Sequence, residues 1–164
     1  MKKYLLASDS HGRDKNLKTV IERNLPLSGF LFLGDGEGLE DRIRDYVEDD
    51  CPLFMVRGNN DFSSELPREL VITLGKSRIL LTHGNRLGVS YELNRLSYRA
   101  EELGCDTAFF GHTHVPERVN VGGVLLINPG SISLPRQYPR LPSYILIELD
   151  DRGELHYQQA YLRD

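Results

Sequence analysis

Short apolar runs recur along this chain, and most end in a glycine or in a side chain able to bind a metal ion. The first three runs lie at residues 3–8, 29–33 and 52–56. The segments between them, 16–25 and 39–50, carry apolar residues at the spacing of an amphipathic helix. This order predicts parallel strands joined by crossover helices.

The later runs favour antiparallel pairing. Three pairs of runs are each joined by a short turn, which is the pattern of a hairpin: 69–74 with 77–82, 117–121 with 124–128, and 143–149 with 154–162. We expect a helix over 90–103, ended by Gly104, and a further strand at 106–110. Two mixed sheets covered by helices accommodate both kinds of unit.

Length and charge limit the class of protein. The 164 residues fit a single domain over 1–164 with volume for a core. A net charge of −4 argues against a nonspecific nucleic-acid coat. Cys51 and Cys105 form no C-x-x-C pair, so we expect free, buried thiols. The first apolar run is too short for a signal peptide, and no run is long enough to span a bilayer. We therefore expect a cytoplasmic protein without membrane contact. Assembly into a homo-oligomer stays open.

Seven metal-capable side chains lie in the loops that follow apolar runs: Asp9, His11, Asp35, Asn59, His83, His112 and His114. Parallel strands bring such loops to one edge of a sheet, so we expect these side chains to converge. Taken singly, each has an ordinary role as a turn residue, a helix cap or a hydrogen-bonded core histidine. The fifth histidine, His156, lies in an alternating run where we expect a surface position. Turn chemistry does not explain why the other four gather, so the pattern predicts a metal site.

The ordered motifs resemble those of the calcineurin-like metallophosphoesterases, and the compact length resembles the small prokaryotic phosphodiesterases among them. The motifs are D-S-H at 9–11, G-D at 34–35, G-N-N-D at 58–61, T-H-G at 82–84 and G-H-T-H at 111–114, with closing segments at 128–131 and 142–149. The resemblance implies an α/β fold of four layers, an α/β/β/α sandwich of two mixed β-sheets flanked by helices. It also implies two metal ions at the strand ends.

The resemblance assigns each ligand: Asp9, His11 and His114 to the first metal ion, Asn59, His83 and His112 to the second, and Asp35 as the bridge. Imidazole with carboxylate or amide oxygen suits borderline divalent ions, with Mn²⁺ first and Ni²⁺, Fe²⁺ or Zn²⁺ as alternatives. Two such ions bring four positive charges against two carboxylates, so a bridging water is expected to ionise near neutral pH. We expect this hydroxide to attack phosphorus in line, with no covalent enzyme intermediate.

The chain departs from the family pattern at Asn60, where much of the superfamily has a histidine placed to protonate the leaving group or contact phosphate. Asparagine donates a hydrogen bond but delivers no proton at pH 7, and general acid catalysis is worth about a hundredfold to ten-thousandfold. Asn60 is thus left as a candidate phosphate contact. Asp61 is a candidate to orient a ligand histidine or to hold a turn. Arg136, in the proline-rich loop 133–142, is a candidate to clamp phosphate.

We therefore expect a metal-dependent phosphodiesterase acting on a phosphodiester-containing small molecule or nucleotide. Two other functions stay open. One is a non-catalytic docking scaffold, as in the retromer subunit that resembles this fold; it predicts broken ligand sets, whereas all seven positions here carry competent side chains. The other is a phosphomonoesterase, which Asn60 disfavours.

Overall fold

The computed structural model describes residues 1–163, which form two five-stranded sheets. The first sheet has the order β10-β9-β1-β2-β3. Its strands are β1 (Lys2–Ala7), β2 (Gly29–Phe32), β3 (Leu53–Met55), β9 (Ser143–Leu149) and β10 (Leu155–Tyr161). The first three are parallel, and β9 and β10 add an antiparallel hairpin beside β1.

The second sheet has the order β4-β5-β6-β8-β7. Its strands are β4 (Glu69–Leu74), β5 (Ser77–Thr82), β6 (Thr107–Phe109), β7 (Pro116–Val121) and β8 (Val124–Pro129). The central strands β5, β6 and β8 are parallel, whereas β4 and β7 pair antiparallel at the edges. The structure confirms the three predicted hairpins and the parallel opening units.

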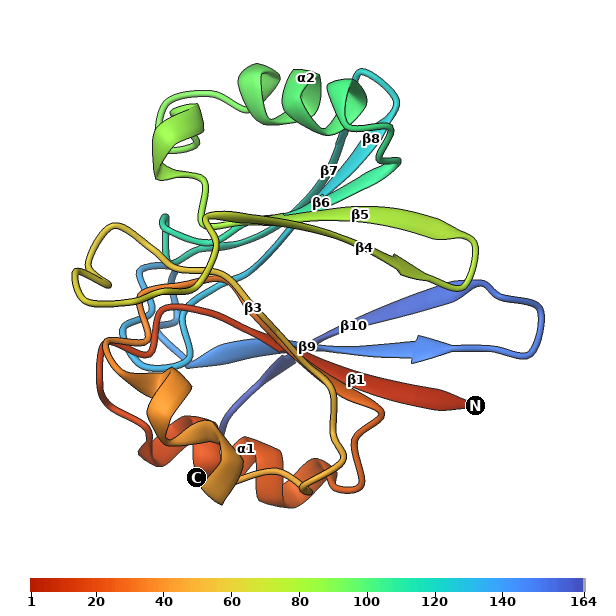
Figure 1. Cartoon of the computed structure of the whole chain (residues 1–164). Helices are drawn as coiled ribbons and strands as arrows, with labels where there is room; N and C mark the ends of the chain where they lie inside the picture. Colours follow the sequence, from red (N-terminus) through yellow and green to blue (C-terminus); the bar gives the residue numbers. More distant parts are fainter. Residues whose placement is uncertain (164) are drawn as a thin grey trace.

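The sheets pack face to face, with α1 (Lys15–Asn24) outside the first and α2 (Asn94–Glu102) outside the second (Figure 1). Successive side chains of a strand point to opposite faces, so β1 serves two cores. Leu5 packs in the cluster with Leu17 of α1, whereas Leu6 packs with Leu81 and Phe109 of the other sheet. The predicted four-layer sandwich is confirmed.

The predicted helix over 39–50 is wrong. The structure has two 3-10 turns there, η1 (Leu39–Asp41) and η2 (Ile43–Asp45). Arg42 and Tyr46 both bind the carboxylate of Asp14, and their φ values of −113° and −107° interrupt the helical backbone. Acidic residues 48–50 would also lie at the helix C-terminus, where negative charge is unfavourable.

The second helix is shorter than the expected 90–103. It begins only at Asn94, whose backbone N–H donates to the carboxylate of Glu92 over 2.8 Å. The preceding segment forms a 3-10 turn, η3 (Asn85–Leu87), that ends at Gly88 with φ of 66°. No helix within residues 1–163 is long and apolar enough to cross a membrane.

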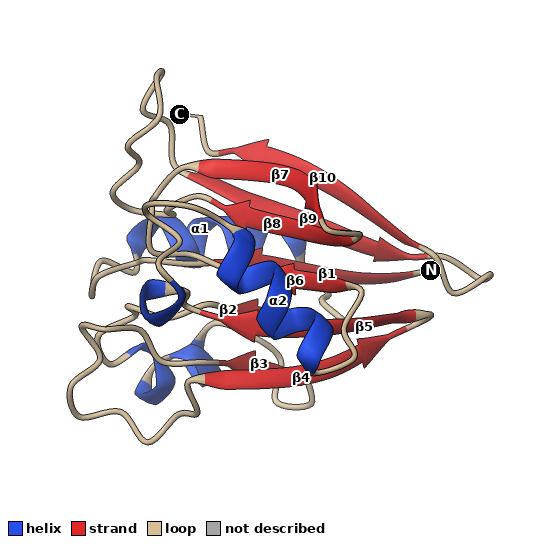
Figure 2. Cartoon of the chain, turned by 90° about the horizontal axis from the view of Figure 1, so that it is seen from above, coloured by secondary structure: helices blue, strands red, loops and turns tan. Residues whose placement is uncertain are grey.

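The loops that follow β1, β2, β3, β5 and β6 gather at one side of the molecule, on the left in Figures 1 and 2. This is the edge at which the carboxyl ends of the parallel strands meet. The sequence places the predicted metal ligands in these loops, so the topology brings together residues as distant as 9 and 114.

Candidate metal centre

The loops after β1, β2, β5 and β6 bring ligand atoms of five predicted residues together. Asp9, His11 and His114 offer one ligand atom each within 4.8 Å of one another, and so do Asp9, Asp35 and His83. Asp9 belongs to both groups. Asp35 also faces a histidine of each predicted ligand set, because its Oδ2 lies 3.2 Å from Nε2 of His83 and 3.8 Å from Nε2 of His11.

His112 lies next to these groups. Its ring stands edge-on to that of His83, with the ring centroids 5.2 Å apart. Its backbone N–H donates to Oδ2 of Asp9 over 3.1 Å. The structure therefore places all four loop histidines around the two carboxylates.

Three of the histidines have their Nδ1 atoms bound on the side away from the centre. Nδ1 of His83 donates to the carbonyl oxygen of Leu33, and Nδ1 of His114 to that of Leu134, each over 2.7 Å. Nδ1 of His11 lies 3.0 Å from a carboxylate oxygen of Glu37. Such partners orient a ligand imidazole and leave its Nε2 lone pair for a metal ion.

Two buried ligand atoms at the centre lack the hydrogen-bond partners that buried polar atoms need, and two other Nε2 atoms face each other. Nε2 of His11 and Nε2 of His114 lie 3.2 Å apart, although both rings bind outward through Nδ1. Oδ1 of Asp9 and Nε2 of His83 are buried without any hydrogen-bond partner within residues 1–163. Unpaired buried polar atoms are costly. A divalent cation among them would satisfy both kinds of atom, so the residues present fit a metal centre.

The backbone of the site is strained. Five of the seven predicted ligands have positive φ values between 50° and 72°: Asp9, His11, Asp35, His112 and His114. A non-glycine residue held in this region costs about 1 kcal/mol or more and persists only where its surroundings enforce it. Such residues cluster at functional sites, which is where this chain has them.

The glycines of the motifs let neighbouring loops approach the carboxylates. A Cβ on Gly58 would lie 2.2 Å from Oδ1 of Asp35, and one on Gly111 would lie 2.7 Å from Oδ2 of Asp9. Real Cβ atoms do not come this close to another atom. The glycine before Asn59 and the glycine before His112 are therefore needed to close the site, beyond any role in turning the chain.

Of the two consecutive asparagines, the structure brings Asn60 to the centre. Its backbone N–H donates to Oδ1 of Asp35 over 2.9 Å and its side-chain amide donates to Oδ2 over 3.0 Å. Asn59 is exposed, and no side-chain hydrogen bond is formed by it within residues 1–163. Asn60 therefore orients the predicted bridging carboxylate, a role that its motif did not indicate.

Asp61 has the turn role that was one of its two predicted alternatives. Its buried carboxylate accepts hydrogen bonds from the backbone N–H groups of Asp35, Glu37 and Gly58 over 2.7 to 2.8 Å. No histidine hydrogen bond to Asp61 is formed among the described residues. Asp61 thus ties the loop after β2 to the loop after β3, and its effect on the ligands passes through the backbone.

The backbone N–H of Arg136 donates to the carbonyl oxygen of His114 over 3.0 Å. Its side chain is exposed, as is that of His156, which was predicted to be on the surface. Asn128 was not among the predicted site residues, but its buried amide donates to the carbonyl oxygen of Gly111 and to the hydroxyl of Thr113. Only its place in the segment 128–131 pointed to it.

Burial and neighbouring charges have opposite effects on the pKa values of Asp9 and His83 in the metal-free protein. Burial would raise the pKa of Asp9, but the imidazoles of His11 and His114 outweigh it and hold this pKa below its usual range. Burial would lower the pKa of His83, but the carboxylates of Asp35 and Asp9 raise it to about 8. A metal ion bound at these atoms would compete with protons for the same lone pairs, so its binding would depend on pH.

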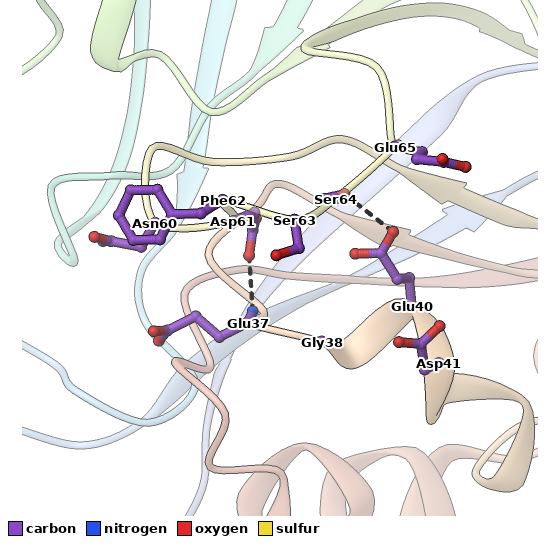
Figure 3. Close-up of a pocket in the computed structure, with 10 residues that line it drawn as sticks. All are labelled: Glu37, Gly38, Glu40, Asp41, Asn60, Asp61, Phe62, Ser63, Ser64 and Glu65. Atoms are coloured by element: carbon purple, nitrogen blue, oxygen red, sulfur yellow. Dashed lines mark hydrogen bonds between the residues drawn. The ribbon is translucent and has the colours of Figure 1, made fainter.

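A cavity of about 480 Å³ lies between the loop after β2 and the loop after β3, which carries Asn60 and Asp61 (Figure 3). Its lining includes five carboxylate side chains: Glu37, Glu40, Asp41, Asp61 and Glu65. Glu37 and Asp61 belong to the loops that hold the centre, and Figure 3 shows the hydrogen bond from the backbone of Glu37 to Asp61. We call it the acidic cavity.

The sequence profile of the calcineurin-like phosphoesterase superfamily domain matches residues 2–152. A probable metallophosphoesterase of Bacillus subtilis, YsnB, is 40% identical over 148 residues, which cover 90% of this chain and 84% of that protein. A solved structure of a conserved Streptococcus pneumoniae protein, a predicted phosphoesterase, is 28% identical. It aligns with a TM-score of 0.77 over 98% of each chain.

Two more distant structures share the fold. An archaeal phosphodiesterase is 20% identical, with a TM-score of 0.73 over 98% of this chain and 99% of that one. Vps29 of Entamoeba histolytica, complexed with zinc, is 22% identical, with a TM-score of 0.73 over 97% of this chain and 98% of that one. The profile match covers nearly the whole sequence, and the Bacillus relative is similar over most of its own length. This chain belongs to the calcineurin-like phosphoesterase superfamily.

Proposed function

We propose that this chain is a single-domain phosphodiesterase that hydrolyses its substrate at a dinuclear metal centre. One observation carries the proposal: among the described residues, Oδ1 of Asp9 and Nε2 of His83 are buried without a hydrogen-bond partner. The Nδ1 atoms of His83 and His114 are bound to backbone carbonyl groups, so their Nε2 atoms are left for a metal ion. The archaeal phosphodiesterase with this fold is consistent with the proposal. Two divalent ions, Mn²⁺ by preference, would supply positive charge that lowers the pKa of a water molecule and attracts the phosphate.

The proposed ligand sets are those implied by the motifs: Asp9, His11 and His114 for one ion, Asn59, His83 and His112 for the other, and Asp35 shared. The short distances from Asp35 to His83 and His11 support its shared position. Asn59 is exposed, so it would complete the second set only with its side chain turned toward the centre. Asp9 also lies in both groups of ligand atoms, so it holds the two halves of the centre together.

The reaction adds water across a P–O ester bond. The water oxygen bonds to phosphorus, the ester oxygen leaves, and one water proton ends on that oxygen. Asn60 keeps Asp35 oriented through two hydrogen bonds but donates no proton to the leaving group. Diesters with good leaving groups are therefore favoured over those that need a general acid.

We expect the Mn²⁺-loaded protein to hydrolyse bis(p-nitrophenyl) phosphate faster than p-nitrophenyl phosphate. Removal of metal with a chelator should lower the rate at least about a hundredfold, and Mn²⁺ should restore it, because the metal-held charge activates water and binds phosphate. Initial rates of p-nitrophenol release measure this. Absence of turnover with every divalent ion would instead favour the docking scaffold, and faster monoester cleavage would favour a phosphatase.

The consecutive asparagines form a matched pair of variants. Asn59→Ala should lower the affinity for one of the two ions, because it removes a proposed ligand. Asn60→Ala should leave two ions bound but lower kcat/KM about tenfold to a hundredfold, since a hydrogen bond to a charged group is worth about 1.5 to 3 kcal/mol. Metal content after dialysis and steady-state kinetics separate the two. Loss of an ion only in Asn60→Ala would show that the ligand is misassigned by one residue.

A further inference from the structure

A second cavity, of about 260 Å³, opens beside His83. Its walls come from three separate segments of the chain. Arg57 belongs to the loop after β3, Arg68 immediately precedes β4, and Arg86 lies in η3. Thr82 ends β5 and His83 follows it. We call it the basic cavity.

The three arginines of the basic cavity lack acidic partners. Within residues 1–163 none of them lies within 4.0 Å of a carboxylate oxygen, and Arg57 donates instead to the backbone carbonyl of Ser64 over 2.9 Å. Glu69, the acidic residue of this lining, forms an ion pair with Arg99 over 2.8 Å. Arg68 and Arg86 are exposed and line one cavity with Arg57. Partial desolvation and the like charges of Arg57 and Arg86 lower the pKa of Arg68, as expected for neighbouring cations. A cluster of this kind attracts an anion.

The basic cavity is continuous with the metal centre through His83. This residue lines the cavity, and its Nε2 lies 3.2 Å from Oδ2 of Asp35. The acidic cavity meets the same centre from another side, where Asn60 and Asp61 line it. A substrate whose phosphorus atom lies at the metal centre would therefore face the positive charge of the basic cavity on one side. On another side it would face the negative charge of the acidic cavity.

From this arrangement we propose that the natural substrate is a phosphodiester carrying a second anionic group, such as a phosphate monoester, on one of its two ester arms. The second anion binds Arg57, Arg68 and Arg86, and the uncharged arm faces the acidic cavity. Guanidinium groups suit this role because they bind phosphate oxygens through paired N–H donors. This inference rests on the proposed phosphodiesterase function and adds the substrate class.

The test compares two substrates that differ only in the second anion: the p-nitrophenyl ester of thymidine 5′-phosphate, with and without a 3′-phosphate. At low ionic strength we expect the 3′-phosphorylated compound to have a kcat/KM at least about tenfold higher. In the double variant Arg68→Gln/Arg86→Gln the ratio of the two kcat/KM values should fall toward one. Arg152→Gln, in the distant β9–β10 turn, is the matched control and should keep the wild-type ratio. Arg57 is left intact because it contacts the loop that carries Asn59.

A wild-type ratio near one, or a high ratio that survives the double substitution, would overturn the inference. Added salt should also lower the ratio, because it screens exposed charges. If neither compound is cleaved with any divalent ion, the proposed phosphodiesterase function is wrong. The anion site is then tested separately, by measuring ligand binding. Calorimetry then compares thymidine 3′,5′-bisphosphate with thymidine 5′-monophosphate. Tighter binding of the bisphosphate that the double variant loses supports the anion site, and equal affinities refute it.

Discussion

Asp35→Asn should abolish most activity, with kcat/KM on bis(p-nitrophenyl) phosphate falling on the order of a thousandfold. Removal of one group that stabilises charge in a hydrolytic site commonly costs a hundredfold to a thousandfold, and Asp35 faces histidines of both proposed ligand sets. The asparagine keeps the size of the side chain but removes the negative charge that two cations would share. Metal content after dialysis should fall from two ions to one or none.

The matched control for this variant is Asp41→Asn. Asp41 is an exposed carboxylate of the acidic cavity, outside both proposed ligand sets. It should keep both ions and a rate within about threefold of the wild type, because exposed charges act weakly across water. If Asp35→Asn retained two tightly bound ions and a near-normal rate, the shared carboxylate would have to be Asp9, which also belongs to both groups of ligand atoms.

Asp61→Ala should give the largest loss of stability, lowering the free energy of unfolding by about 4 kcal/mol. The substitution removes the acceptor of three backbone N–H groups, those of Asp35 and Gly58, which are buried, and that of Glu37, which is partly buried. Hydrogen bonds to a charged group are worth about 1.5 to 3 kcal/mol each and do not add fully. Urea unfolding of the metal-free protein measures the change without a contribution from metal binding.

Asp150→Ala provides the comparison for Asp61→Ala. Asp150 also accepts two backbone hydrogen bonds, from Arg152 and Glu154 over 2.9 Å, but at the exposed β9–β10 turn. Water can replace that carboxylate, so we expect a loss of about 1 kcal/mol. Equal losses in the two variants would show that Asp61 does not hold the loops of the site together.

The motifs of the sequence predicted which side chains would lie close together, because each proposed ligand lies in a loop that follows a strand. Once β1, β2, β5 and β6 run parallel, their carboxyl ends meet, and Asp9, Asp35, His83 and the pair at 112 and 114 follow without further information. The glycines of the motifs had a role that spacing alone did not reveal. Gly58 and Gly111 exclude a Cβ that would overlap a carboxylate of the centre.

Long-range contacts explain where local patterns failed. The stripe of Leu39, Ile43 and Val47 is buried as an amphipathic helix would bury it. The backbone is not helical there, because Asp14 binds Arg42 and Tyr46 from another segment. The spacing of apolar residues predicts which side chains are buried. It does not predict that Asp14, 28 or more residues away, forms hydrogen bonds that compete with the helix.

The amino-acid sequence by itself determined the layered fold, its family and the residue types available as ligands, since apolar periodicity and ligand chemistry are both local properties. Only the tertiary structure decided that Asn60 rather than Asn59 contacts Asp35, and that Asp61 binds backbone rather than histidine. It alone also joined Arg57, Arg68 and Arg86 into one cavity. These features depend on how separate loops pack, because the direction of a loop side chain and the sum of charges around a cavity are set by neighbours distant in the chain.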